Sequence, residues 1–555
     1  MRKLTTRLTV LVMTIVMLAG CSGNVEQVGS NHGKGADSKG EAANSAQTSS
    51  SAAETPAQEL VFAISKDIND MNPHLYPGLM AAQGMVYESL VENTSEGIKP
   101  LLAESWDVSE DGLVYTFHLR KGVVFHDGEP FNAEAVKQNI EAVQRNAAKH
   151  SWIKLSTKIV STTVVNEHTV ELKLSEPYYP ALEELSMTRP FVFISPKDFV
   201  NGETKDGVSG HHGTGPYKLI EQKTDQYAVF EANESYWNGA PKIKKITAKV
   251  LPSGETTYLA LKKGEVNLIF TDDRGADSID VEAMKQLVDS GDYQLVRSEP
   301  MNTKMIVANS SRKESPVHDK AVREAIWYAI DREMLSKQIF SGTESPAKSL
   351  FSSNVNYAQV DLKPRDYNPE QAKELLEQAG WLAEGEGART KNGAPLAMKL
   401  YFDINSSTQK TEAEYLQNAL KQIGMQIELV GEESSSIAGR RSSGDYDLLF
   451  NQTWGLAYDP QSTVSAFTSE SSYYYTTSGI EHADELYRKI GEVMVTKDEA
   501  SRKALYADIL RTVHDEAVFI PLTNGSVTVI ASSKLQGIGF KQTQYELPFE
   551  RMYVE

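Results

Sequence analysis

A short apolar run that ends in turn-forming residues constrains the fold more than any other part of the sequence. The run Tyr446-Asp-Leu-Leu-Phe450 has the length and composition of a strand that is buried on both faces. Gly455 and the pair Asp459-Pro460 follow it, and these residues favour a turn of the backbone. The sequence therefore predicts a buried strand that delivers its last residues to the rim of a sheet.

Two amphipathic aromatic residues, Trp454 and Tyr458, lie in this turn. Parallel-sheet proteins usually bind ligands beyond the carboxyl ends of their strands, so both rings are candidate ligand-binding residues. The alternative is that the rings only pack within the loop. A second aromatic-rich set far upstream favours ligand binding, because it needs a partner across a cleft.

The chain length and the net charge limit the classes of protein to which this sequence can belong. The chain has 555 residues, which is too long for one hydrophobic core, so two or three domains or lobes are expected. The formal net charge is -19, and no long basic patch occurs outside the extreme N-terminus. This composition argues against nucleic acid as a partner, because phosphate binding needs concentrated lysine and arginine.

The N-terminus has the pattern of an export signal. Basic residues at positions 2, 3 and 7 precede the apolar stretch 8–18, which is too short to remain as a membrane span. The sequence Leu18-Ala-Gly-Cys21 then resembles the lipobox of bacterial lipoproteins. That resemblance implies a signal peptide over residues 1–20 and an acylated Cys21 as the first mature residue. The alternative is an ordinary secretory signal with an accidental cysteine.

The segment that follows Cys21 is polar. Residues 21–58 contain almost no large apolar side chain, so we interpret them as a flexible tether between the lipid anchor and the folded body. Cys21 is also the only cysteine, which excludes a disulfide or a multi-thiolate metal site within one chain.

The folded body begins with a predicted strand over residues 60–64 and a predicted helix over 80–90. Alternating polar and apolar residues over 104–127 predict a hairpin joined at 110–112. Asn132 is the expected N-cap of the next helix.

From residue 59 to the C-terminus, the sequence resembles the large peptide/nickel-type extracytoplasmic solute-binding proteins of ABC importers. The matching motifs are collinear with that family and occur at residues 102–106, 111–112, 115–120, 125–128, 130–134, 213–217, 233–237, 322–325, 330–332, 372–381 and 515–521. Within the family, four segments are similar to the nickel branch: 74–76, 150–152, 189–191 and 454–460. Three others are similar to receptors for opine-type metallophores such as staphylopine: 272–275, 300–304 and 451–455.

The resemblance implies an α/β, two-lobed periplasmic-binding-protein fold of type II, with a hinge and an interlobe cleft. It implies that residues 59–299 and 526–555 form lobe I and that residues 300–525 form lobe II. The chain would cross between the lobes near 299–300 and again near 522–525, and a ligand would close the cleft.

The residues that match the family's cleft are Tyr76, Met80, Trp152, Arg189, Trp454, Tyr458 and Tyr545. Arg189 offers a planar fork of donors that suits a carboxylate, although a structural ion pair is the alternative. The aromatic residues suit a ligand with both apolar and charged faces, and ordinary core packing is their alternative. Met80 could lie beside a transition metal, but a methionine on a helix more often fills a core.

The sequence contains no metal site that the protein would build alone. It has no His-Glu-x-x-His helix, no cysteine cluster and no carboxylate-rich calcium loop. The adjacent pair His211-His212 favours a surface loop, because neighbouring side chains on extended backbone point apart. Segment 461–475 lacks the histidine that nickel-histidine binders of the family can place there, which favours a ligand that already saturates its metal. This segment also lacks arginine, so the carboxylates of such a ligand would meet only Arg189, hydroxyls and amides.

The resemblance thus predicts a substrate-binding lipoprotein of an ABC transporter that captures chelated nickel, cobalt or zinc with an opine-type metallophore. The expected partners are the permease subunits, the metal chelate and, through the lipid anchor, the outer face of the cell membrane. We expect a monomer with no covalent cofactor. An oligopeptide receptor, a nickel-histidine receptor and a chemosensory accessory protein remain alternatives. A hydrolase is disfavoured, because the sequence has no Gly-x-Ser-x-Gly elbow, no thiol left free after acylation and no recognisable histidine base.

Overall fold

The computed structural model describes residues 58–270, 281–383, 385, 387–470 and 472–555. The predicted signal peptide, Cys21, almost all of the predicted tether and the motif at 272–275 lie outside these residues. None of the described helices combines the length and the apolar composition that a membrane span needs.

A mixed sheet of 11 strands organises the described body. Its order is β10 (Tyr217–Lys223), β11 (Tyr227–Ala232), β12 (Lys245–Val250), β1 (Glu59–Ile64), β13 (Leu268–Phe270), β21 (Phe519–Ser532), β14 (Tyr293–Ala308), β20 (Leu448–Gln452), β18 (Ala397–Asp403) and β19 (Gln426–Glu432), with β15 (Ser345–Pro346) paired to β21. Strand β1 pairs in parallel with β12 and β13, and β18 pairs in parallel with β19 and β20. The other pairs are antiparallel.

The buried strand predicted at residues 446–450 is β20, which begins two residues later. It lies between β14 and β18. Leu448 and Leu449 are fully buried and belong to two different hydrophobic cores, because successive side chains of a strand point to opposite faces. The prediction of a strand covered on both faces is therefore confirmed.

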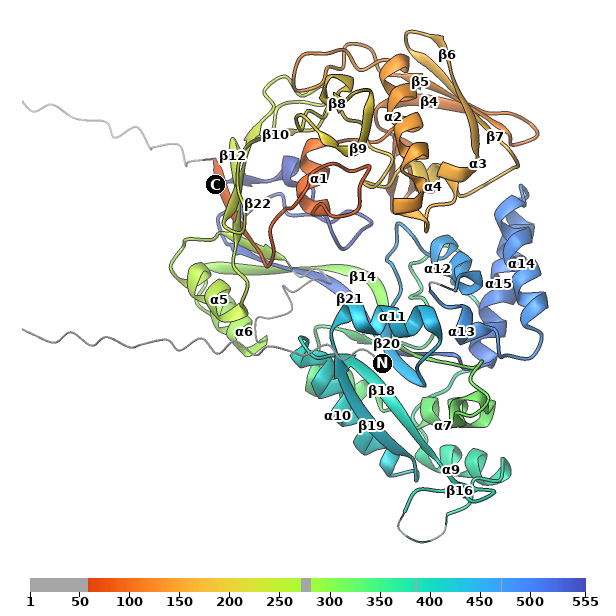
Figure 1. The fold of residues 1–555 in the computed structure, drawn as a ribbon. Helices are drawn as coiled ribbons and strands as arrows, with labels where there is room; N and C mark the ends of the chain where they lie inside the picture. The colour runs from red at the N-terminus through yellow and green to blue at the C-terminus, as the bar shows by residue number, and fades with distance from the viewer. Residues whose placement is uncertain (1–57, 271–280, 384, 386, 471) are drawn as a thin grey trace, which may run out of the picture. The chain divides into compact units, whose positions relative to one another are not determined.

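Two long strands connect the two halves of this sheet. Figure 1 shows β14 and β21 side by side, and their antiparallel pairing runs from Tyr293 opposite Ser532 to Val307 opposite Phe519. The register shifts on both sides of Pro300, as expected where a proline interrupts a ladder of backbone hydrogen bonds. The predicted lobe crossings at 299–300 and 522–525 fall within these strands, and the lobe boundaries stay a prediction.

A second sheet has the order β4 (Ala103–Val108), β5 (Val114–Leu119), β7 (Thr169–Leu174) and β6 (Ile159–Asn166). The predicted hairpin is β4–β5, and its turn closes through the N–H of Gly112, which donates to the carbonyl of Ser109 at 2.9 Å. The predicted N-cap is also confirmed, because Asn132 Oδ1 accepts the N–H of Ala135 at the start of α2.

The remaining strands form small pairs: β2 (Val91–Thr94) with β3 (Gly97–Pro100), β8 (Phe199–Val200) with β9 (Glu203–Val208), β16 (Thr390–Lys391) with β17 (Ala394–Pro395), and β22 (Leu535–Gln536) with β23 (Tyr553–Val554). The α-helices are α1 (Met80–Val86), α2 (Ala133–Arg145), α3 (Leu155–Lys158), α4 (Ala181–Leu185), α5 (Gly254–Lys262), α6 (Val281–Asp289), α7 (Lys320–Tyr328), α8 (Arg332–Met334), α9 (Pro369–Gln378), α10 (Ser407–Lys421), α11 (Ser434–Ser443), α12 (Gln461–Ser465), α13 (Tyr474–Thr477), α14 (Ala483–Val495) and α15 (Glu499–Asp515).

Helix α1 is shorter than the sequence predicts. It ends at Val86 because Tyr87 adopts an extended backbone, and Ser89 then forms an isolated bridge with Val192. The expected continuation to residue 90 is therefore wrong, since pairing with a distant segment overrides the local helical pattern.

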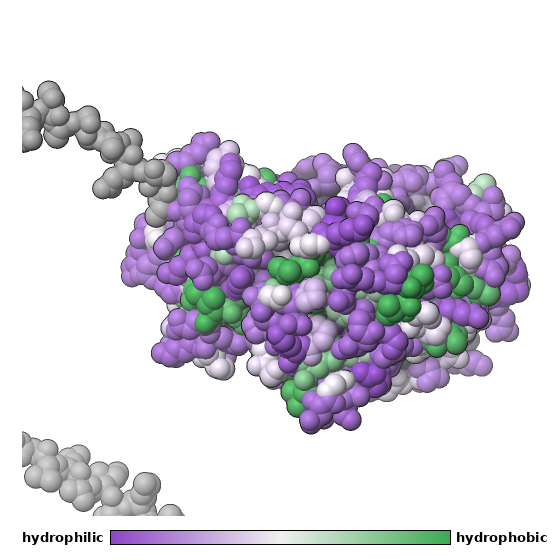
Figure 2. All heavy atoms as spheres, turned by 90° about the horizontal axis from the view of Figure 1, so that it is seen from above, coloured by the Kyte–Doolittle hydropathy of each residue, from purple (hydrophilic) through white to green (hydrophobic). Residues whose placement is uncertain are grey.

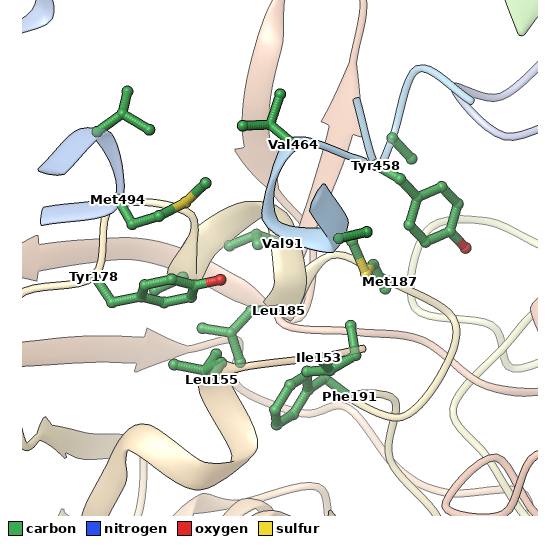
Figure 3. Packing of buried hydrophobic residues seen from close by; sticks show 14 of the residues in the cluster. Val91, Ile153, Leu155, Tyr178, Leu185, Met187, Phe191, Tyr458, Val464 and Met494 are labelled. Carbon is green, nitrogen blue, oxygen red and sulfur yellow. The ribbon is translucent and has the colours of Figure 1, made fainter. Parts of the chain in front are cut away.

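The largest hydrophobic core joins segments that are far apart in the sequence. Figure 3 shows Leu155, Tyr178 and Leu185 packed in the same cluster as Val464 and Met494. The face of the molecule in Figure 2 is mostly hydrophilic, with hydrophobic residues in small separate groups. Such isolated groups are normal on a protein surface.

Candidate functional site

A cavity of about 430 Å³ lies at the carboxyl end of β20. Its lining consists of Tyr76, Met80, Ser151, Trp152, Lys154, Arg189, Arg441, Asn451, Gln452, Thr453, Trp454, Tyr458, Ser462, Ser465, Ala466, Ser469, Ser472 and Tyr545. The structure thus brings together all seven residues that the sequence nominated. The volume lies within the range of small-molecule sites.

Trp152 connects the upstream and downstream aromatic residues. Its ring centroid lies 6.4 Å from that of Trp454 and 5.8 Å from that of Tyr458, and both pairs meet edge to face. Among the described residues, the buried indole N–H of Trp152 has no hydrogen-bond partner. The upstream and downstream aromatic sets therefore meet in direct contact at the cavity, where they offer apolar walls together with one unused donor.

Arg189 is fixed at the cavity wall by backbone groups. Its side chain is 4% exposed, and Nη1 donates to the carbonyl of Tyr76 and, at 3.0 Å, to that of Gly78. The guanidinium also lies over the ring of Tyr76, 4.8 Å from the ring centroid. These contacts hold the charged group in one orientation, which reduces the entropy that an incoming carboxylate would have to remove.

The loop that carries Trp454 and Tyr458 is closed by a buried carboxylate. Asp459 accepts hydrogen bonds from the backbone N–H of Gly455 at 3.1 Å and from the hydroxyl of Thr463. Burial raises the pKa of Asp459 to about 7, against the opposing effect of these donors. The carboxyl group therefore sets the geometry of the aromatic loop from behind the cavity wall.

Gly455 permits a close contact in this loop. Its φ is +103°, and a Cβ atom there would lie 2.2 Å from the side-chain oxygen Oε1 of Gln544. Tyr545, the next residue, reaches the cavity from this C-terminal segment. Met80 is the first residue of α1 and is 5% exposed, so it both contributes to a hydrophobic core and touches the cavity.

The structure corrects one expectation about charge. The sequence left Arg189 as the only cation available to the ligand, but Arg441 from α11 and Lys154 from the loop before α3 also line the cavity. Lys154 follows Trp152 by two residues, so its proximity to the site was a usable signal. Arg441 gave no such signal, because nothing in the sequence separates it from its neighbour Arg440.

The lining has an unusual charge balance for an acidic protein. Its described residues include three cationic side chains and no aspartate, glutamate, histidine or cysteine, whereas the whole chain has a net charge of -19. Serine hydroxyls from segment 462–472 and the amides of Asn451 and Gln452 complete the polar surface. Such a cavity favours a ligand that carries negative charge and supplies every ligand of any metal it brings.

The histidines near the site have structural roles. His74 is buried, contacts the hydroxyl of Thr204 at 3.1 Å and has its pKa lowered to about 3 by burial. His150 lies behind Trp152 with a ring centroid distance of 6.2 Å, and burial lowers its pKa to about 4. Neither ring belongs to the cavity lining.

The pair His211-His212 is divided between two partners. His211 Nδ1 lies 3.4 Å from the hydroxyl of Tyr87, whereas His212 Nδ1 lies 2.9 Å from Asp198 Oδ1. Within the described ranges, no group of three or more histidine, cysteine, aspartate or glutamate side chains is arranged to hold a metal ion.

Outside the cavity lining, two backbone hydrogen bonds also connect segments that are far apart in the sequence. The N–H of Tyr179 donates to the carbonyl of Met494 at 3.0 Å, and the N–H of Ala457 donates to the carbonyl of Gln542 at 2.9 Å. Arg502 also lies over the ring of Tyr179, 5.1 Å from its centroid. We call these the flanking contacts.

Comparison with known proteins decides the family. Residues 97–475 match the model of "Bacterial extracellular solute-binding proteins, family 5 Middle". The chain belongs to this family. The nickel-binding periplasmic protein of Escherichia coli K12 is 39% identical over 89% of this chain and 94% of its own length.

Solved structures agree with this assignment. NikA from Brucella suis, in complex with Fe(III)-EDTA, superposes with a TM-score of 0.86 at 40% identity and covers 90% of this chain and 100% of its own. NikZ from Campylobacter jejuni, in complex with Ni(L-His), has the same fold with a TM-score of 0.74 at 23% identity, and it covers the same shares of the two chains. The predicted α/β periplasmic-binding-protein fold and the predicted peptide/nickel-type family are confirmed, and so is the prediction that this solute-binding chain is not an enzyme.

Proposed function

We propose that this chain is the receptor of an ABC importer for a transition metal that arrives already chelated, and that it delivers the chelate to the permease subunits. The charge of the cavity lining carries this proposal. Three cations, large aromatic surfaces and serine hydroxyls suit the carboxylates and apolar flank of a chelator, whereas the described lining offers no histidine, cysteine, aspartate or glutamate to bind a metal directly.

The relatives support the same class of ligand. The Escherichia coli relative is named for nickel binding, and the Brucella suis relative holds Fe(III)-EDTA, in which an aminopolycarboxylate surrounds the metal. Opine-type metallophores are also aminopolycarboxylates. We therefore propose nickel, cobalt or zinc held by such a chelator as the cargo.

An oligopeptide and a nickel-histidine complex are the competing ligands. A peptide brings a cationic amino terminus, which an acidic partner would stabilise, but the described lining contains no carboxylate. In a nickel-histidine complex the metal gains from an additional protein imidazole, but Ser472 and the other hydroxyls near it offer none. Both features favour the saturated chelate.

We further propose that Cys21 is acylated and that residues 21–58 tether the receptor to the outer face of the cell membrane as a monomer. The motif at 18–21 and the polar composition after it support this proposal. Ligand binding would then close the two lobes at a hinge within β14 and β21.

Native mass spectrometry with elemental analysis of the purified folded body tests the proposal directly. We expect a mass increment equal to one metal plus one aminopolycarboxylate. Calorimetric titration should then show tight binding of Fe(III)-EDTA or of nickel loaded on an opine, and weak binding of hydrated nickel and of a random tripeptide pool. Tight binding of the tripeptides or of the bare ion would overturn it.

A further inference from the structure

Two adjacent arginines near the end of α11 have different surroundings. Arg440 is held by Glu432 and Asp445, each at 2.7 Å, and lies over the ring of Tyr401. Arg441 has no ion pair with any described residue and lines the cavity instead. Arg440 therefore stabilises the fold through its ion pairs, whereas the charge of Arg441 is not balanced by an ion pair with a described residue.

The surroundings of Arg441 suit the binding of an anion. Its Nε atom is buried and has no hydrogen-bond partner among the described residues. Its guanidinium lies 6.0 Å from the ring centroid of Tyr473, and the side chain lines the same cavity as Asn451, Gln452 and the serine hydroxyls. A partly buried guanidinium without a counter-charge is costly, and a bound carboxylate removes that cost.

Arg441 and Arg189 reach the cavity from separate parts of the chain. Arg189 is fixed by the backbone of residues 76–78, whereas Arg441 lies beside Tyr473, whose hydroxyl donates to the carbonyl of Gln452 at 3.2 Å. A ligand with a single carboxylate brings one counter-charge to these two cations. A ligand with two outward carboxylates can satisfy both.

We propose that Arg441 is a specificity-determining residue that binds a second carboxylate of the ligand and selects chelates with at least two carboxylates. This inference rests on the proposed function and names the feature of the chelate that the receptor recognises. A guanidinium matches a carboxylate with two parallel N–H···O bonds, so a lysine at this position should be a poorer substitute.

The test measures the affinity of the folded body for Fe(III)-EDTA by calorimetry. Arg441→Gln should weaken binding roughly 10- to 100-fold, because it removes one charge-assisted contact and leaves a carboxylate without its partner. Arg441→Lys should recover only part of the loss. The matched control is Arg488→Gln, which removes the same charge from an exposed ion pair on α14 and should change affinity less than about twofold.

A second arm changes the ligand instead of the protein. The Fe(III) complex of an EDTA bis-amide replaces two carboxylates with neutral amides. Wild type should bind this probe more weakly than Fe(III)-EDTA, and Arg441→Gln should then lose less affinity for it than for Fe(III)-EDTA. Such non-additivity indicates a direct contact between Arg441 and a ligand carboxylate.

Three results would overturn the inference. Undiminished affinity of Arg441→Gln for Fe(III)-EDTA is the first, and equal losses for both probes are the second. Equal affinity of wild type for the two probes is the third, and it applies even if the variants fail to fold. Failure of wild type to bind both Fe(III)-EDTA and nickel-loaded opine would overturn the proposed function as well, so the two failures are distinguishable.

Discussion

The carboxylate of Asp459 accepts the backbone N–H of Gly455 at 3.1 Å, so a buried acid fixes the turn that presents Trp454 and Tyr458 to the cavity. The hydrogen bond spans only four residues. Any change to either partner should therefore act on the aromatic wall rather than on the distant core.

The stability of the wild type should fall relative to Asp459→Asn as pH rises from 5 to 8. Burial raises the pKa of Asp459 from 3.8 to about 7 in the folded state, so the folded protein holds this proton where the unfolded chain has lost it. The contribution is fully present below pH 3.8 and is lost as pH rises towards 7, which amounts to about 2–3 kcal/mol between pH 5 and 8. Denaturant unfolding of both proteins at pH 5 and 8 measures this change. A difference in the free energy of unfolding between wild type and Asp459→Asn that is the same at both pH values would contradict the prediction.

Gly455→Ala should destabilise the protein and weaken ligand binding together. The new Cβ meets Gln544 Oε1 at 2.2 Å and a φ of +103° disfavours any L side chain, so we expect a loss of about 1–3 kcal/mol. Gly207→Ala is the matched control, because Gly207 has a φ of +109° and open space around its Cβ direction. Thermal unfolding compares the two variants. An equal loss in both would show that the contact with Gln544 contributes nothing.

Arg189→Ala should cost about 2–5 kcal/mol of binding free energy, or roughly 30-fold or more in affinity, because it leaves a carboxylate of the proposed ligand unpaired in the cavity. Arg189→Lys should recover part of this loss, since an ammonium cannot make the planar two-point contact. Titration with nickel-loaded opine or Fe(III)-EDTA checks both. Wild-type affinity in Arg189→Ala would place the ligand elsewhere.

Trp454→Ala should cost about 1–3 kcal/mol of binding free energy, mainly through faster dissociation, because it removes the cavity ring that packs edge to face on Trp152. If Trp454 and Arg189 both act in the closed state that we propose, their effects should be non-additive in the double variant. Stopped-flow kinetics with the single and double variants measures the dissociation rates. Strictly additive effects would argue that the two residues act independently.

Cys21→Ala should abolish fatty-acid labelling of the protein in cells without changing ligand affinity, because we propose that the motif at 18–21 serves only acylation. Metabolic labelling followed by fractionation checks the anchor, and calorimetry on the released protein checks the site. A variant that still incorporates the labelled fatty acid would exclude this cysteine as the modification site.

The sequence predicted the parts of the site that lie next to strong local signals. The apolar run before Asn451 marked a buried strand, and the residues after it became candidates by position alone. The family resemblance then supplied Tyr76, Trp152, Arg189 and Tyr545, which no local pattern brings together.

Arg441 could not be predicted because its role depends on which face of α11 meets the cavity. The helix buries no residue completely, so its sequence has no apolar stripe from which to read an orientation. Helix α1 was overextended for a related reason, since the bridge from Ser89 to Val192 depends on a contact that is distant in the sequence. Tertiary contacts therefore determine both the orientation of α11 and the end of α1, and local sequence patterns do not contain this information.

The flanking contacts offer a way to change the affinity of this receptor without changing its ligand specificity. The hydrogen bonds from Tyr179 to Met494 and from Ala457 to Gln542 join segments that are far apart in the sequence, as the proposed ligand would, but none of these four residues lines the cavity. If they form only on closure, each 1.4 kcal/mol gained or lost there multiplies the affinity for every ligand by about ten and leaves the ratios between ligands unchanged. Mutations at these positions would then raise or lower the affinity of the receptor to suit scarce or abundant cargo, without changing its preference among ligands.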